Sequence, residues 1–543
     1  MKRRNVLALI ASGTIAAVAL AIGKLLPSSN AQQSGTADIP AKTTQPGANP
    51  IVAENASFGT TGWQIPPGAA ATTEIQAYVS DRSVAPGQSL TFYVSTQTEG
   101  TSYTLAIYRL GWYQGTGGRL MSSVQLTGKA QGYYVGSTFE LVNCPTAFQD
   151  PSTGLVEARW QPSYMLTIPH DWTTGVYLVK CIDEYGKQTY TTFDVLGNET
   201  APYIVVTADT TYAAYNNWGG RSLYPLSSKG KSPAAKVSFD RPSTMQDGSD
   251  QVLIFEANTI RWLEREGYNV SYMSSIDLHT HPEKLLNHQA YLSIGHDEYW
   301  TKEMRDGVEA ARDHGVGLAF LEANASYWQI RLEPNSAGVP NRTVVCYKVL
   351  STDNFASDSG GVVRNSLAQD PLFGVDNTRV TSLWRDPVIG RPENAMVGIM
   401  YSDYNSKLRG TSWTFDPQIT GATFLHNTLL QGTGLQAGQS FDNGLVGYEW
   451  DRVFNNGHTP AGLQILATSE AKNIYGIQDT SNTAYYIAPS GALVFATGSI
   501  YWTAALDSYR YDWSLNDTSE SQEIPEIQQL MTNIMNALIK QHR

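Results

Sequence analysis

The fold is decided by the stretch AYLSIGHDEYW, residues 290–300. Its first five residues are apolar apart from Ser293, as in a strand of a parallel sheet that is buried on both faces. Gly295 then permits a tight turn, and the polar residues 296–298 follow it. Because α/β domains bind ligands beyond the carboxyl ends of their strands, we expect any chemistry at this elbow, residues 295–300, at the exposed end of the strand.

Strands and helices alternate on both sides of this stretch. Upstream lie an apolar strand at 203–207, a helix at 255–266 that stops at Gly267, and a strand at 270–273. Downstream, Thr301 can cap a helix that stops at Gly315, and residues 316–321 form the next strand. This alternation predicts a parallel sheet with helical crossovers.

The flanking regions are rich in short strands. Runs of β-forming residues separated by turn residues predict an antiparallel, Ig-like β-sandwich over 55–198. After about residue 340 the chain becomes rich in loops and strands, and a helix over about 523–540 ends it. We therefore expect an α/β domain with β-rich additions over 199–543.

The N-terminus predicts export. Lys2, Arg3 and Arg4 precede an apolar run over 6–22, and small residues end at Ala31, so residues 1–31 resemble a signal peptide. The adjacent arginines resemble a twin-arginine signal, although Sec signals also begin with basic residues. Uncleaved, the segment would tether the protein to a membrane. We expect a secreted or extracytoplasmic protein with a flexible spacer over 32–54.

The composition argues against a nucleic-acid partner and against a disulfide framework. The 543 residues carry a net charge of -12 and 41% hydrophobic residues, which is typical of an ordered protein with no basic field for nucleic acid. Three cysteines cannot form a disulfide framework for this length. Cys144 and Cys181 could pair after export, which would leave Cys346, or all three are buried free thiols.

Histidines cluster near the elbow. His279, His281, His288 and His296 lie within 18 residues. The spacing of His279 and His281 could suit zinc, but this stretch runs into Pro282, so two surface histidines in a loop are the favoured interpretation. His296 and Glu298 point to function. The alternative is that His296 satisfies a backbone carbonyl and Glu298 caps the next helix.

A second polar and aromatic cluster, residues 210–224, follows the strand at 203–207. Two parallel strands that end at one edge would bring these tyrosines near Glu298. Tyrosinates with a carboxylate are hard oxygen donors suited to a hard metal. A phenol has a pKa near 10, so the cation itself must stabilise the phenolate. Otherwise these are loop aromatics that pack on the domain.

Several motifs together carry a resemblance. The motifs are IYRLGWY at 107–113, AYNNWGG at 214–220, IRWLEREGY at 260–268, the elbow, and ANASYW at 323–328. In this order they resemble the C-terminal region of the large (beta) chain of N,N-dimethylformamidase and its relatives, over about 70 to 510. That region is similar to class I glutamine amidotransferases, which are flavodoxin-like. The elbow here carries no cysteine, so a Cys–His mechanism is disfavoured.

The resemblance implies an amidohydrolase with a mononuclear non-haem iron held by two tyrosines and one glutamate. By motif, the glutamate is Glu298, with His296 beside it and Asn324 nearby, and the tyrosines are Tyr215 or Tyr212 together with Tyr224. Glu449 is a candidate further site residue or a buried structural carboxylate. The expected set is therefore Tyr215, Tyr224 and Glu298 around ferric iron, with His296, Asn324 and Glu449 as catalytic residues.

The sequence supports two alternative functional hypotheses. The first is an exported amidohydrolase-like enzyme for a small amide, with an oligomer or a small partner subunit as the resemblance implies. The second is a non-catalytic extracellular protein with a degenerate amidotransferase-like domain, which binds carbohydrate or cell wall through its aromatic residues. The enzyme requires the tyrosines to converge on Glu298, with a hydroxyl within about 4 to 5 Å of a carboxylate oxygen, whereas the binding protein predicts scattered residues.

Overall fold

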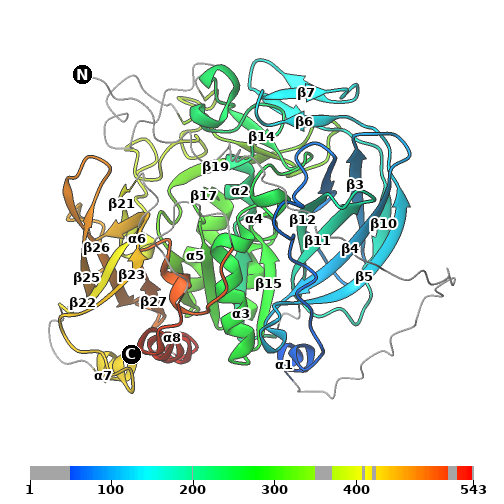
Figure 1. Cartoon of the computed structure of the whole chain (residues 1–543). Coiled ribbons are helices and arrows are strands. Elements are labelled where there is room, and N and C mark those ends of the chain that lie inside the picture. The colour runs from blue at the N-terminus through cyan, green and yellow to red at the C-terminus, as the bar shows by residue number, and fades with distance from the viewer. Residues whose placement is uncertain are drawn as a thin grey trace.

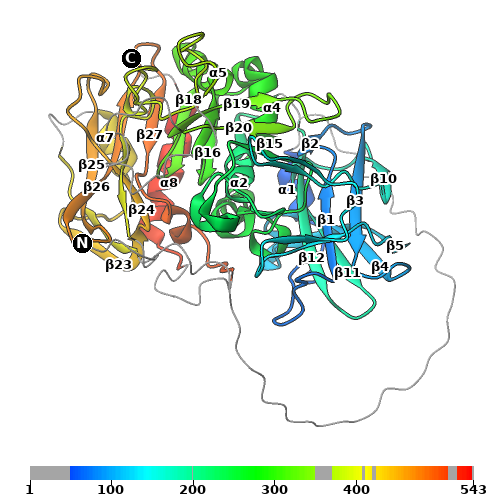
Figure 2. The same ribbon diagram turned by 90° about the horizontal axis from the view of Figure 1, so that it is seen from above.

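The computed structural model describes residues 49–197, 200–348, 370–405, 410–418, 424–511 and 522–540. The chain is a mixed α/β protein rich in strands (Figure 1). Seen from above, an N-terminal β part, a central α/β part and a C-terminal β part lie in a row (Figure 2). The predicted signal peptide and residues 32–48 of the predicted spacer lie outside the described residues.

The N-terminal part contains two mostly antiparallel sheets that share one core. Their strand orders are β1-β3-β10 and β2-β12-β11-β4-β5. Phe92 of one sheet and Phe193 of the other meet edge to face in this core, with ring centroids 6.1 Å apart. The strands are β1 (Ile75–Val79), β2 (Ser83–Val84), β3 (Ser89–Thr96), β4 (Ser102–Leu110), β5 (Gly118–Thr127), β6 (Tyr133–Val135), β7 (Glu140–Val142), β8 (Phe148–Asp150), β9 (Leu155–Glu157), β10 (Tyr164–Thr167), β11 (Gly175–Asp183) and β12 (Gln188–Val195).

The end of the predicted spacer is ordered, which differs from our expectation of a flexible segment over 32–54. Residues Pro50–Asn55 form helix α1, and Ile51 is fully buried. Asn49 caps this helix by accepting a hydrogen bond from Ile51 N at 3.0 Å, and its Nδ2 donates to Gly267 O at 2.7 Å. The last residues of the predicted spacer therefore form a short capped helix that contacts the central part.

The central part is built on a seven-stranded sheet of order β15-β13-β16-β18-β27-β26-β25. The first five strands are parallel and the last two are antiparallel. The chain leaves β13 to form β15 on one side and then β16 on the other, so β13 and β16 flank the switch point where such sheets bind ligands. The strands are β13 (Tyr203–Thr207), β15 (Val270–Ser274), β16 (Ala290–Gly295), β18 (Gly317–Glu322), β25 (Gln464–Lys472), β26 (Gln478–Ile487) and β27 (Leu493–Ala496).

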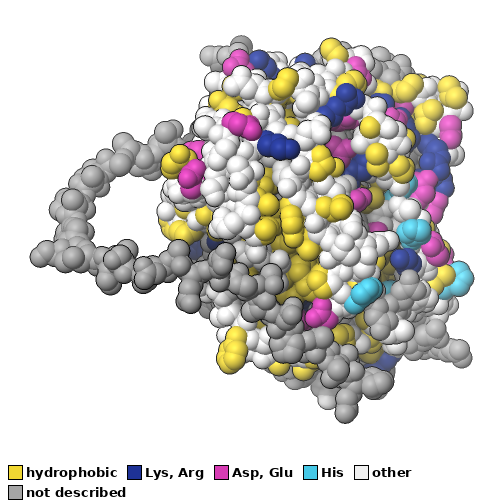
Figure 3. Space-filling model, turned by 90° about the vertical axis from the view of Figure 1, so that its right-hand side faces the viewer, with side chains coloured by type: hydrophobic (Ala, Val, Ile, Leu, Met, Phe, Trp, Pro, Cys, Tyr) yellow, Lys and Arg dark blue, Asp and Glu magenta, His cyan; other side chains and the backbone are white. Residues whose placement is uncertain are grey.

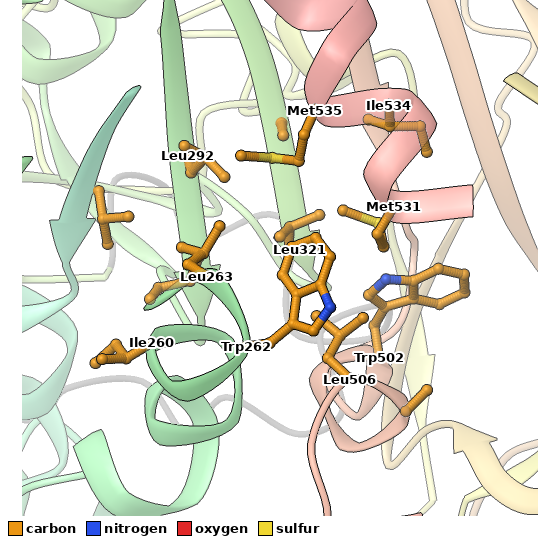
Figure 4. Packing of buried hydrophobic residues seen from close by; sticks show 14 of the residues in the cluster. Ile260, Trp262, Leu263, Leu292, Leu321, Trp502, Leu506, Met531, Ile534 and Met535 are labelled. Carbon is orange, nitrogen blue, oxygen red and sulfur yellow. The ribbon is translucent and has the colours of Figure 1, made fainter. Parts of the chain in front are cut away.

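Helices cover both faces of this sheet, as the predicted alternation requires. On one face, α3 (Ala257–Arg265) and α8 (Pro525–Leu538) pack on Leu292 and Leu321 (Figure 4). On the other face, α4 (Ser275–Thr280) and α5 (Lys302–Asp313) pack against alternate residues such as Phe320. Because successive residues of a strand point to opposite faces, apolar runs without alternation fit these strands.

The predicted helix boundaries are confirmed near the elbow. Thr301 Oγ1 accepts a hydrogen bond from Met304 N at 3.1 Å and caps α5. Gly295 has φ of +88°, the left-handed conformation that the predicted tight turn requires. Residues 296–298 therefore follow directly after a buried strand and a tight turn, as the sequence predicts.

The C-terminal part is rich in strands, as predicted. Small sheets pair β21 with β24 and β22 with β23, and a four-stranded sheet of order β14-β20-β19-β17 lies across the central part. The elements are β14 (Lys236–Ser238), β17 (Tyr299–Thr301), β19 (Trp328–Glu333), β20 (Thr343–Val345), α6 (Asn394–Val397), β21 (Met400–Tyr404), β22 (Thr411–Phe415), α7 (Phe424–Leu430), β23 (Gln439–Val446) and β24 (Glu449–Arg452).

The surface and the cysteines add two observations. On the face shown in Figure 3, Lys and Arg side chains are scattered singly and in small groups. All three cysteines are free thiols, so the alternative of a Cys144–Cys181 pair is not what the structure has. Within the described residues, no helix is both long and apolar enough to cross a membrane.

Candidate active site

The elbow after β16 is buried, whereas we expected it at an exposed strand end. His296 and Asp297 are fully buried, and Glu298 is 3% exposed. The prediction of an exposed end was wrong because other segments cover this edge of the sheet. Helix α2 (Asp209–Tyr215) packs against this edge, and β19 pairs in parallel with β17, which includes the last two residues of the elbow. The site is consequently shielded from bulk water.

The backbone of the elbow is held by hydrogen bonds to neighbouring elements. Thr211 Oγ1 accepts from the backbone N–H groups of Glu298 and Tyr299 at 3.0 and 3.1 Å. The N–H of Asp297 donates to Glu322 Oε2 at 2.5 Å. The cap of α5 is Thr301, so the alternative that Glu298 caps this helix does not apply. The carboxylate of Glu298 is therefore available to the site.

Two tyrosines converge on Glu298. Tyr215, the last residue of α2, donates its hydroxyl to Glu298 Oε2 at 2.7 Å. The hydroxyl of Tyr224 lies 3.0 Å from both carboxylate oxygens and 2.9 Å from the hydroxyl of Tyr215. The two rings are stacked with centroids 4.5 Å apart. The expected donor set of two phenols and one carboxylate is thus brought together.

Tyr212 lies elsewhere. Its hydroxyl donates to the buried carboxylate of Glu256, away from Glu298. Of the two tyrosines that the motif left open, Tyr215 is therefore the one that reaches the site.

Burial sets the protonation of this cluster. Burial, followed by the charge of Glu298, raises the pKa of Tyr215 and Tyr224 well above the usual value of a phenol. Burial alone would also raise the pKa of Glu298, but the nearby imidazole of His296 and the positive charge of Lys348 outweigh it, so this pKa is lowered. In the absence of a metal ion, these pKa shifts favour an ionised carboxylate next to two neutral phenols.

His296, Glu449 and Asn324 lie beside this donor set. His296 Nε2 lies 3.4 Å from Glu298 Oε2 and 3.6 Å from Glu449 Oε2. Within the described residues neither ring nitrogen makes a directed hydrogen bond, so His296 does not satisfy a backbone carbonyl. Burial, with the charge of Glu298, raises the pKa of Glu449 to about 7. Asn324 donates from Nδ2 to Glu449 Oε2 at 3.0 Å.

Asn324 is held in place by its backbone. Its φ is +63°, a conformation that asparagine tolerates better than most residues, and its N–H donates to Asp451 Oδ1 at 2.8 Å. The side-chain Oδ1 is buried and has no hydrogen-bond partner among the described residues. A fixed amide with a free acceptor suits the orientation of a polar ligand.

A match to a protein family follows this geometry. A family model described as N,N-dimethylformamidase beta subunit-like, C-terminal, matches residues 104–517, more than half of the chain. The chain belongs to this family. A relative is the N,N-dimethylformamidase beta subunit of Alcaligenes sp., which is 26% identical over 228 residues. That match spans 34% of this chain and 30% of the relative.

Solved structures add no argument for this member of the dimethylformamidase β subunit-like family. Spo0M of Bacillus subtilis matches with a TM-score of 0.15 and 10% identity, over 24% of this chain and 51% of that chain. Superoxide reductase of Ignicoccus hospitalis matches with a TM-score of 0.13 and 9% identity, over 24% of this chain and 85% of that chain. At such scores neither fold nor function follows.

Three residues around the site were missed as site residues by the sequence analysis. Trp328 donates from Nε1 to Glu298 Oε1 at 3.0 Å, and the hydroxyl of Tyr299 donates to that of Tyr224 at 2.5 Å. Lys348 Nζ donates to Tyr299 at 2.5 Å and lies 3.8 Å from the centroid of the Tyr224 ring. Burial lowers the pKa of Lys348 to about 8. Trp328 and Tyr299 lie in the quoted motifs, whereas no motif includes Lys348.

The histidine pair does not converge. His279 lies in α4 and its Nδ1 is 2.9 Å from Thr301 Oγ1. The side chain of His281 is about half exposed, and its Nδ1 lies 3.3 Å from Glu283 Oε1. The prediction of a loop here was wrong for His279, because Ser274 caps α4 through Asp277 N. Within the described part of the chain, no group of three His, Cys, Asp or Glu side chains is arranged to hold a metal, and the tyrosine set is of another kind.

The geometry separates the two functional hypotheses for this dimethylformamidase-like chain. The hydroxyls of Tyr215 and Tyr224 lie 2.7 and 3.0 Å from Glu298, inside the 4 to 5 Å that the enzyme hypothesis requires. A binding protein with a degenerate domain predicts scattered residues. The binding-protein hypothesis is therefore not favoured.

Proposed function

We propose that this chain is an exported amidohydrolase-like enzyme that hydrolyses a small amide at a ferric ion held by Tyr215, Tyr224 and Glu298. One observation carries the proposal: two phenol oxygens and a carboxylate lie within 3.0 Å of one another in a buried site. Family membership supports the class of reaction.

The donor set fits such an ion chemically. Phenolates and a carboxylate are hard anionic oxygens, which suit a hard trivalent cation. Because the raised pKa values keep both phenols neutral in its absence, binding must release their two protons, which would pass to solvent. When bound, the ion would polarise an amide carbonyl and lower the pKa of a water molecule.

The remaining residues would handle protons and orient the substrate. His296 lies between Glu298 and Glu449, and both carboxylates favour its protonated form over the effect of burial, so its pKa is raised. We assign to His296 the donation of a proton to the leaving nitrogen, and to the carboxylate of Glu449 the acceptance of a proton from the attacking water. Asn324 Oδ1 would accept a hydrogen bond from the bound substrate or water. Water is the nucleophile in this scheme, since the elbow presents no cysteine.

The finer architecture belongs to the same proposal. We infer an Ig-like sandwich over 55–198 and an amidotransferase-like, flavodoxin-like domain with β-rich additions over 199–543. The parallel strand order β15-β13-β16-β18-β27 supports the second assignment, because numbering these strands along the chain gives the flavodoxin-like order 2-1-3-4-5.

The proposal also includes export and a partner subunit. Residues 1–31 would direct export, with cleavage after Ala31 or retention as a membrane tether. The relative is named a beta subunit, which supports a second polypeptide as partner for this chain. Mass spectrometry of the exported protein would give its N-terminus and the partner. A cytoplasmic protein with an intact Met1 would contradict export.

Purified residues 32–543, reconstituted with ferric iron, provide the test of the metal site. We expect about one iron per chain by elemental analysis, visible tyrosinate-to-iron absorption, and amine release from one or more small amides. Tyr215→Phe should lose the absorption, whereas Tyr212→Phe is the matched control and should keep the iron. A colourless, metal-free protein after reconstitution would overturn the proposal.

A further inference from the structure

The two tyrosines of the site are joined by a loop that surrounds a buried arginine. The loop runs from Tyr215 to Tyr224, and we call it the tyrosine loop. Arg241 donates from Nη1 to Trp218 O at 2.6 Å and to Arg221 O at 3.1 Å. Its Nη2 donates to Asn216 O at 2.8 Å. One guanidinium thus gathers three carbonyl groups between the tyrosines.

The position of Arg241 is energetically expensive. The residue is 3% exposed, and among the described residues no carboxylate lies within ion-pair distance of it. Burial lowers its pKa to about 9. A buried cation without a counter-ion is strongly unfavourable unless hydrogen bonds compensate for the lost water. The carbonyls of the tyrosine loop supply that compensation, so the loop and the arginine stabilise each other.

The outer side of the tyrosine loop is held by the N-terminal sandwich. Trp218 is fully buried against Trp160, with ring centroids 5.9 Å apart, and its Nε1 donates to Gln76 Oε1 at 2.9 Å. Gly219 has φ of +84°, and a Cβ there would lie 2.5 Å from Val156 Cγ1. The loop is therefore held on its inner side by Arg241 and on its outer side by the sandwich.

We propose that Arg241 is a positioning residue that sets the separation of the Tyr215 and Tyr224 hydroxyls over Glu298. The proposal rests on the proposed function for its effect on iron. Three hydrogen bonds of 2.6 to 3.1 Å fix the carbonyls of residues 216, 218 and 221. This restricts the loop that joins Tyr215 to Tyr224. Lysine cannot replace this planar fork, because a single ammonium does not match three fixed acceptors in the same geometry.

The experiment compares Arg241→Met and Arg241→Lys with Arg305→Met. Arg305 is the control, because it too is fully buried and donates to backbone carbonyls, those of Arg391 and Pro392. It differs from Arg241 in lying in α5 and in pairing with Glu309 at 2.8 Å. We expect Arg241→Met to weaken iron binding at least tenfold and to shift the tyrosinate-to-iron band, and Arg241→Lys to have an intermediate effect. Arg305→Met should lower the melting temperature comparably and leave the band unchanged.

A metal-free readout separates this proposal from the proposed function. In crystals of the metal-free proteins, we expect the Tyr215 and Tyr224 hydroxyls to remain 2.9 Å apart in Arg305→Met and to exceed hydrogen-bond distance in Arg241→Met. Failure of the wild-type chain to bind iron would overturn the proposed function alone. Retention of the 2.9 Å spacing in Arg241→Met would overturn the role of Arg241, whatever the iron content. Should Arg241→Met not fold, the spacing in Arg241→Lys decides.

Discussion

The elbow and the tyrosine loop supply the same candidate site, but they are held in opposite ways. The elbow, residues 295–300, continues a strand of the parallel sheet, and its N–H groups find acceptors in Thr211 and Glu322. The tyrosine loop directs carbonyl groups inward, and they accept hydrogen bonds from Arg241. The carboxylate therefore depends on the sheet core, whereas the tyrosines depend on a polar clamp and on another part of the chain.

This difference separates two kinds of failure. A change in the elbow should remove the charge that the site is built around. A change in the tyrosine loop should leave that charge in place and alter the distance between the phenols. The following variants are ordered by the size of their expected effect.

The largest effect is expected for Glu298→Gln. The amide retains the shape but removes the negative charge that both phenols face, so we expect iron content near zero and at least a 100-fold loss of amide hydrolysis. Elemental analysis and an amine-release assay measure both. Glu333→Gln is the control, because its carboxylate pairs with Lys236 at the surface and should leave both values unchanged. Retained iron in Glu298→Gln would contradict the assignment of this ligand.

Two glycines compare the regions directly. Gly295 in the elbow and Gly219 in the tyrosine loop both have positive φ, of +88° and +84°. Alanine at either position should cost about 1 to 3 kcal/mol of stability. We expect Gly295→Ala to reduce both stability and iron binding, and Gly219→Ala to alter the absorption band while carboxylate-dependent binding persists. Thermal unfolding and visible spectra measure this, and identical spectra for the two variants would remove the distinction.

A pH dependence is expected from the carboxyl groups buried behind the elbow. Burial raises the pKa of Glu322 to about 7 and of Asp451 and Glu256 to about 8. Between about pH 4 and pH 8 the unfolded chain loses these protons while the folded chain keeps them, so the stability of the metal-free protein should fall as the pH rises. Each unit of raised pKa corresponds to about 1.4 kcal/mol.

The measurement is the melting temperature of the metal-free protein at pH 5.5 and 8.5. We expect a lower value at pH 8.5, and a smaller difference for Glu322→Gln, which removes one of the titrating groups. A melting temperature that rises with pH would show that these carboxyls are ionised in the folded state.

The smallest effect is expected for His281→Ala. This side chain is about half exposed and its ring lies 3.3 Å from Glu283, an exposed pair that contributes little. Stability should change by less than about 0.5 kcal/mol, and the iron content should stay the same. Loss of metal in this variant would revive the zinc interpretation of the histidine pair.

Much of the fold could be predicted because local signals agree with it. The apolar runs that form β13, β16 and β18 are buried on both faces, and Thr301 caps α5 as its position suggests. The proximity of Tyr215 to Glu298 followed from one rule, that parallel strands end at the same edge of a sheet. Such arguments need only the order of elements along the chain.

Other features arise from contacts that no local pattern contains. Arg241 reaches the tyrosine loop from about 20 residues away, and Lys348 reaches Tyr224 from outside every quoted motif. The burial of the elbow depends on α2, which precedes it in the sequence, and on β19, which follows it. Helix α1 was missed because six residues are too few for a periodic pattern.

The socket for Trp218 bears on how such a protein is inherited. The aromatic residues that receive Trp218 belong to the sandwich, and Arg82 of the sandwich pairs with Asp209 at the start of α2 at 2.6 Å. A gene segment that encodes only the proposed second domain, residues 199–543, would supply Glu298 and both tyrosines without the sandwich residues that pack on Trp218. We expect the segments that encode the sandwich and residues 199–543 to be exchanged between genes as one unit. Recombination near residue 199 should seldom give a functional protein.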